Sequence, residues 1–146
     1  MDMTIPQGLE VLGFEPGSHL ALPLLLCPAP AGFPSPADDY IDQHLNLNEY
    51  LVSHPASTFF VRASGQSMDG DHIQPGDILV VDRAVEPTNG RIVIATVNGE
   101  LTVKRLRRKN GRVYLEPANP AFKPVEILPG TDFEVWGVVT FIVHKA

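Results

Sequence analysis

The sequence contains little cysteine and no long apolar run. Its single cysteine, Cys27, cannot form a disulfide within the chain, which excludes a disulfide-stapled fold and favours a reducing compartment. No apolar stretch approaches the ~18 residues of a membrane-spanning helix. No basic residue precedes the short apolar run at 21–26, as a secretory signal would require. The sequence therefore predicts a cytoplasmic protein without a membrane anchor.

Basic residues are absent from the first 61 positions. That part of the chain contains seven acidic residues, whereas residues 62–146 contain all 11 basic residues and ten acidic ones. With a net charge of −6, the molecule is not expected to bind nucleic acid strongly by itself. The basic run Arg105, Arg107, Arg108 and Lys109 is interpreted as a solvated hairpin end. A contact with a partner protein, or with DNA that a partner holds, is the alternative.

Proline punctuates the start of the chain, and a β pattern dominates from residue 58 onward. Seven prolines within residues 1–39 predict an irregular N-terminal arm, because proline lacks the N–H that ladders and helix interiors use. Asn46 and Glu49 have capping-box spacing and predict a short helix over 46–53. The expected fold is mainly β, a curled and mostly antiparallel sheet domain. Its strands are predicted at 58–63, 78–82, 92–97, 100–106, 113–115, 125–127 and 133–143.

One lysine lies inside an apolar predicted strand. If Asn98 and Gly99 close a two-residue hairpin, Lys104 lies opposite Val93. Burial of that sheet face would lower the pKa of the ammonium, because the charged form loses hydration. The alternative is a lysine on a solvated face with its stem lying along the sheet, which is the commoner outcome for a strand lysine.

A turn rich in glycine and serine separates two predicted strands and contains Ser67. Flanking Gly65 and Gly70 allow backbone conformations that expose a hydroxyl and direct N–H groups at an oxyanion. A neutral Lys104 could accept the Ser67 proton, as in Ser-Lys hydrolases. His72 is too close to Ser67 in sequence for a good triad, and no histidine spacing matches a metal-ligand set, so neither metal nor cofactor is expected.

Six stretches occur in an order and spacing specific to one family. They are GFPSPA at 32–37, FVRASGQSM at 60–68, GDILVVD at 76–82, GELTVKRL at 99–106, EPANP at 116–120 and VWGVV at 135–139. With these stretches the chain resembles the UmuD-type SOS mutagenesis proteins, relatives of the LexA repressor and of leader peptidases. The resemblance covers nearly all of the chain after residue 31.

The resemblance implies a serine endopeptidase that cuts its own N-terminal arm in the SOS DNA-damage response. Ser67 would be the nucleophile and Lys104 the general base, with the backbone N–H groups of Gln66 and Ser67 holding the oxyanion. The matching scissile bond is Ala31–Gly32. Cleavage there would divide the chain into an arm, residues 1–31, and a LexA/signal-peptidase-like peptidase domain, residues 32–146.

The resemblance also implies partners. It suggests a homodimer whose cleavage is stimulated by RecA filaments on single-stranded DNA, and a shortened product that joins a UmuC-like translesion DNA polymerase. A non-catalytic accessory subunit of a polymerase complex, with Ser67 and Lys104 idle, is the open alternative. A LexA-type repressor would need a helix-turn-helix domain, which 31 proline-rich residues cannot hold, and a leader peptidase would need a membrane anchor.

Overall fold

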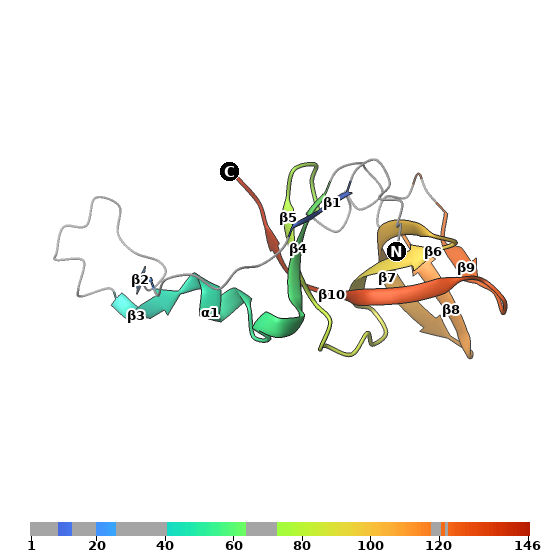
Figure 1. The fold of residues 1–146 in the computed structure, drawn as a ribbon, viewed down its shortest axis with the longest axis horizontal. Helices are drawn as coiled ribbons and strands as arrows, with labels where there is room; N and C mark the ends of the chain where they lie inside the picture. The colour runs from blue at the N-terminus through green and yellow to red at the C-terminus, as the bar shows by residue number, and fades with distance from the viewer. Residues whose placement is uncertain (1–8, 13–19, 26–40, 64–72, 118–120, 122) are drawn as a thin grey trace. The chain divides into compact units, whose positions relative to one another are not determined.

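The structure, a computed structural model, describes residues 9–12, 20–25, 41–63, 73–117, 121 and 123–146 (Figure 1). The chain forms two compact units. The sheet unit comprises Met1–Phe14 and His54–Ala146, and the hairpin unit comprises Glu15–Ser53. Every strand pair among the described residues is antiparallel, and the α-helix found there is one short segment. The mainly β fold expected from the sequence is confirmed.

The sheet unit contains one eight-stranded antiparallel sheet. In spatial order its strands are β1 (Leu9–Leu12), β4 (Thr58–Ala63), β5 (Ile78–Asp82), β10 (Phe133–Val143), β6 (Ile92–Val97), β7 (Glu100–Lys109), β8 (Arg112–Glu116) and β9 (Val125–Ile127). The long final strand predicted at 133–143 has the predicted bounds. It lies at the centre of the order, pairing with β5 through its second half and with β6 through its first half (Figure 1).

Both faces of this sheet are covered by apolar side chains. On β7, Leu101 and Val103 belong to one buried cluster, whereas Leu106 belongs to a second cluster with Val93 and Leu115. Residues at odd and even positions of a strand point to opposite faces. Each face of the sheet therefore carries a core cluster of its own.

Two tight turns explain the β6–β7–β8 meander. Asn98 and Gly99 have φ of 51° and 82°, and Asn110 and Gly111 have 53° and 75°. Positive φ at both central residues is the signature of type I′ hairpins, whose twist matches that of the strands. The second turn lets β7 continue to Lys109, three residues beyond its predicted end, because residues 107–109 pair with β8.

The hairpin unit contains two strands and the short helix. Strand β2 (Ala21–Leu25) pairs with β3 (Ile41–Asn46), and α1 (Leu47–Leu51) follows directly. The Asn46 side chain accepts hydrogen bonds from the N–H groups of Asn48 and Glu49, so the predicted cap is confirmed although the helix is shorter than 46–53. Neither strand was predicted, because Pro23 argued against β2. A two-stranded sheet has only edge strands, where proline is tolerated.

A 3₁₀ turn, Pro55–Ser57, leads into β4 and was also not predicted. Within the described part of the chain, no helix has the length and apolarity that a membrane crossing requires.

Candidate functional site

Lys104 lies in the interior of β7, opposite the fully buried Val93 of β6. The cross-strand register derived from the Asn98–Gly99 hairpin is confirmed along the whole pair, since Thr102 opposes Ala95 and Glu100 opposes Val97. Alternation places the Lys104 side chain on the same face as Leu106, which is buried. The lysine is half-buried, and Val93 opposite it and Leu106 on the same face both belong to the second apolar cluster.

This environment changes the acid–base properties of the amine. Desolvation by burial lowers the pKa of the Lys104 ammonium below its ordinary value of 10.5. The charged form loses hydration in such a site, whereas the neutral amine loses much less. Lys104 is thereby a better proton acceptor near neutral pH than a solvated lysine, which is the property that a general base needs.

A pocket of about 410 Å³ opens beside Lys104. Three of its lining residues, Glu100, Thr102 and Lys104, alternate along β7 and thus share one sheet face. The end of β6, the turn before β7 and strands β8 and β9 contribute the rest of the wall, including Leu115 and Val125. Lys104 therefore lines a hollow of the size range in which proteins bind small ligands.

Ser67 and Gln66, the predicted nucleophile and oxyanion residue, lie outside the described residues, as do Ala31 and Gly32 of the predicted scissile bond. The residues that bound the Ser67 segment are well defined. Ala63, which ends β4, and Ile73 are both buried in the first apolar cluster. The Ala63 N–H donates to the Asp77 carbonyl over 2.8 Å, and the Gly76 N–H donates to the Ala63 carbonyl over 2.6 Å. The described residues on either side of positions 64–72 therefore belong to one core cluster.

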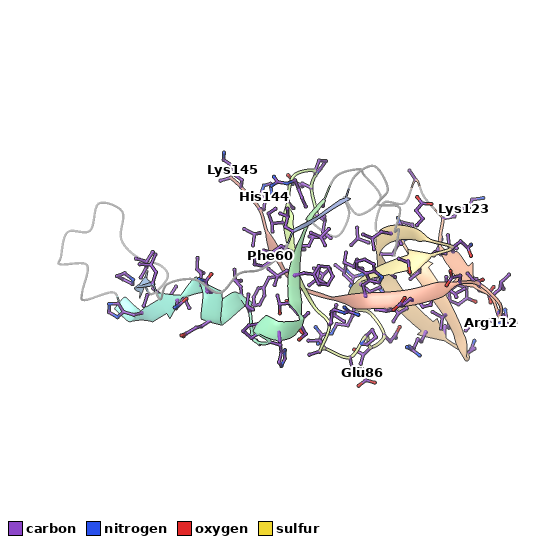
Figure 2. All side chains as sticks on the ribbon, in the orientation of Figure 1. Phe60, Glu86, Arg112, Lys123, His144 and Lys145 are labelled. Atoms are coloured by element: carbon purple, nitrogen blue, oxygen red, sulfur yellow. The ribbon has the colours of Figure 1, made fainter. Side chains whose placement is uncertain are left out.

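A buried carboxylate anchors the chain just after this segment. Asp77 Oδ2 accepts the Gln74 N–H over 2.8 Å, and Asp77 Oδ1 lies 2.6 Å from Nδ1 of His144, which is labelled in Figure 2. A second pair links His54 Nδ1 and the buried Asp82 Oδ2 over 2.6 Å. Neither pair was predicted. The available signal was the position of both aspartates, which flank the apolar run of β5.

The sequence raised two further questions, whether the chain has a metal site and what surrounds the basic run at 105–109. Among the described residues there is no group of three or more His, Cys, Asp or Glu side chains that could hold a metal ion. Of the basic run, Arg108 and Lys109 are exposed at the β7–β8 hairpin, and Arg107 Nε lies 3.4 Å from Glu116 Oε2.

The fold and the site define a small β domain built around one partly desolvated amine beside a pocket. The chain belongs to the Peptidase S24-like family, whose model matches residues 23–140. The chain is 49% identical over 123 residues to Protein SamA of Salmonella typhimurium, covering 84% of this chain and 85% of SamA. It is 47% identical over 121 residues to Protein MucA of Escherichia coli, covering 82% of each.

A more distant relative extends the comparison. The LexA repressor of Bordetella parapertussis is 36% identical over 127 residues, which are 87% of this chain and 58% of the repressor. These similarities confirm the family resemblance drawn from the sequence motifs.

Proposed function

We propose that this protein is a serine endopeptidase that cleaves its own chain at Ala31–Gly32, with Ser67 as nucleophile and Lys104 as general base. The observation that carries the proposal is the lowered pKa of Lys104 beside a pocket. Membership of a peptidase family supports it. Partial burial of a lysine on an interior strand costs folding free energy, because the ammonium loses hydration. Such destabilising placements are concentrated at functional sites, where a neutral amine can act as a base.

The first half of the reaction forms an acyl-enzyme. Neutral Lys104 Nζ takes the proton of the Ser67 hydroxyl, and Oγ attacks the Ala31 carbonyl carbon. The backbone N–H groups of Gln66 and Ser67 stabilise the negative charge that develops on the Ala31 oxygen. Collapse of the tetrahedral intermediate breaks the bond to Gly32, whose nitrogen receives the proton from Lys104.

The second half regenerates the enzyme. Lys104, neutral again, takes a proton from a water molecule that attacks the Ala31–Ser67 ester. The ester bond breaks, Ser67 Oγ recovers a proton, and the arm ends in the new carboxylate of Ala31. The two products are residues 1–31 and residues 32–146.

The placement of the scissile bond suits slow, regulated cleavage. The bond lies in the connection between β2 and β3, and the reacting segment must enter the pocket beside Lys104 in extended form. Ordering that segment opposes chain entropy, and the observed rate is scaled by the fraction of molecules in which it is docked. A partner that stabilises the docked state raises the rate without adding a catalytic group.

The family resemblance extends the proposal to a cellular role. A RecA filament on single-stranded DNA is the expected stimulus, as part of an SOS response to DNA damage. The shortened product is expected to act as a homodimeric subunit with a UmuC-like translesion polymerase.

The test is self-cleavage of the purified full chain, followed by mass spectrometry. We expect loss of residues 1–31, with a rate that rises about tenfold per pH unit and levels off below pH 10.5, because the neutral fraction of Lys104 is complete above its lowered pKa. Ser67→Ala and Lys104→Ala should abolish cleavage. Lys109→Ala, at the exposed end of the same strand, is the matched control and should cleave normally. A pH-independent rate, or cleavage of Ser67→Ala at Ala31–Gly32, contradicts the assignment.

A further inference from the structure

The first strand of the chain closes one edge of the eight-stranded sheet. Strand β1 pairs antiparallel with β4 in a continuous register that runs from Leu9 opposite Ala63 to Leu12 opposite Phe60. These strands lie side by side in Figure 1, and Phe60 is labelled in Figure 2. Because β1 lies within residues 1–31, the proposed cleavage separates it covalently from the sheet that it closes.

The hydrogen bonds of β4 show which of its backbone groups depend on β1. The N–H and C=O of Ala63 both point toward the β5 side, where they bond Asp77 and Gly76. Backbone groups of successive residues in a strand point to alternate sides. The N–H and C=O of Val61 therefore also point to β5, and those of Arg62 and Phe60 point to β1, opposite Glu10 and Leu12. Loss of β1 leaves these four groups of Arg62 and Phe60 without their strand partner.

The β4 edge lacks the features that usually block strand addition. Natural edge strands are shortened, bulged, or carry proline and lysine. The opposite edge of this sheet follows that rule, since β9 has three residues. Strand β4 has six residues, TFFVRA, without proline or lysine, and its register with β1 and β5 is continuous. It is an edge suited to a partner strand.

We propose that the β4 edge is a docking site for an extended segment of a partner protein, which adds antiparallel to Thr58–Ala63 in the place of β1. The opening of this edge by cleavage rests on the proposed function. Backbone hydrogen bonds to Phe60 and Arg62 supply most of the recognition, as in other strand-addition complexes. The segment must therefore be free of proline at the residues that face Phe60 and Arg62.

Covalent attachment explains how cleavage switches this site. In the intact chain β1 is tethered to the sheet unit, and its effective concentration at β4 exceeds that of any partner in solution. Once the chain is cut at Ala31–Gly32, the described residues of the arm are held by the pairing of β1 with β4 and of β2 with β3, so two short strands compete as part of a separate molecule. A longer partner segment that also reaches Thr58 then displaces it.

The test opens the edge without cleavage, in the full chain carrying Ser67→Ala. Leu12→Pro removes an N–H that faces Phe60, whereas Val11→Pro removes one that points away from β4 and serves as the matched control. The probe is a synthetic peptide of residues 7–14, QGLEVLGF, with capped ends. A peptide with proline in place of the residue corresponding to Leu12 is the negative control.

We expect Leu12→Pro to raise amide exchange at Phe60 and Arg62 by about tenfold or more, with Val61 unchanged because its N–H faces β5. The probe should restore protection at Phe60 and Arg62 and bind Leu12→Pro about tenfold more tightly than Val11→Pro. Equal binding of the probe to both variants overturns the proposal. So does continued protection of the Phe60 and Arg62 amides in Leu12→Pro, if it arises because the β4 edges of two copies of the chain pair with each other. Faster amide exchange at Val61 as well would mean that β4 separates from β5 when β1 is lost. That result also overturns the proposal.

A second measurement separates this proposal from the proposed function. In wild-type protein after cleavage, the amides of Phe60 and Arg62 should become exchange-labile and the probe should bind. If the chain never cuts itself but the probe binds Leu12→Pro selectively, the peptidase assignment fails and the docking edge stands. If the chain cuts itself but these amides stay protected, the edge is not opened by cleavage and the docking proposal fails.

Discussion

The sheet unit and the hairpin unit differ in how much of their apolar side-chain surface is buried. In the sheet unit, Leu79 and Ile94 are fully buried, and two apolar clusters cover both faces of the sheet. In the hairpin unit, Leu22, Leu47 and Tyr50 are each more than half exposed, and α1 has no buried residue. An isolated two-stranded sheet is marginally stable in water, whereas a large sheet with two covered faces is not.

The difference matches the two roles that self-cleavage demands. A general base must be held in place by rigid surroundings, and Lys104 lies on an interior strand of the sheet opposite the fully buried Val93. A scissile segment must leave its resting conformation to enter a pocket, and the connection that contains Ala31–Gly32 joins two weakly held strands. In this proposal a well-packed catalytic unit acts on a poorly packed substrate unit of the same chain.

Hydrogen exchange gives the largest expected contrast between the two units. Amides of β5 should exchange about 1,000-fold or more slowly than those of β3, because the first open only with the core and the second open locally. Residue-resolved exchange of the Ser67→Ala chain measures this. Equal protection of β3 and β5 would show that the hairpin unit unfolds only with the sheet unit, which breaks the comparison.

Truncation of one leucine in each unit gives the next contrast. Leu79→Ala should lower the free energy of unfolding by about 3 kcal/mol, because it leaves a cavity in a fully packed core. Leu22→Ala is the matched control and should change it by less than about 0.5 kcal/mol, since its side chain is 54% exposed. Urea unfolding followed by circular dichroism measures the free energy of unfolding of each variant. Similar decreases for both variants would contradict the contrast between the two units.

A third substitution tests how closely β10 and β5 pack inside the sheet unit. A Cβ added at Gly137 would lie 2.7 Å from Val81 Cγ1 and 3.2 Å from the Asp82 carbonyl oxygen. Gly137→Ala should therefore destabilise the protein by about 2 kcal/mol, since the backbone of β5 has little room to shift. Urea unfolding measures the loss, and a neutral result would mean that β10 and β5 move apart readily at Gly137.

The smallest expected effect concerns the lysine itself. Since burial lowers the Lys104 pKa, its charge penalises the folded state below that pKa, and the penalty fades as pH rises toward 10.5. Lys104→Met should raise Tm by about 2 °C at pH 7, and by less at pH 10. Lys109→Met, at the exposed strand end, should change Tm little at either pH. A gain for Lys104→Met that grows with pH would contradict a desolvated amine.

Local patterns predicted much of the sheet unit. Five of the seven predicted strands have the predicted bounds, among them β4, β5 and β10, because their apolar runs end at glycine, proline or asparagine turns. The Asn98–Gly99 turn also fixed the partner of Lys104, since a two-residue hairpin has one register. By contrast, β1 has only four residues, β2 contains Pro23 and β3 is largely polar, so their pairing depends on partners distant in sequence.

The sequence by itself determined the strands after residue 58, the hairpin register and the identity of the candidate lysine, because each follows from neighbours within a few residues. Only the tertiary structure decided that Lys104 is half-buried beside a pocket, that Asp77 meets His144, and that β1 closes the β4 edge. These features join residues 48 or more positions apart or depend on what packs over a sheet face. Long-range packing, rather than local propensity, sets such contacts.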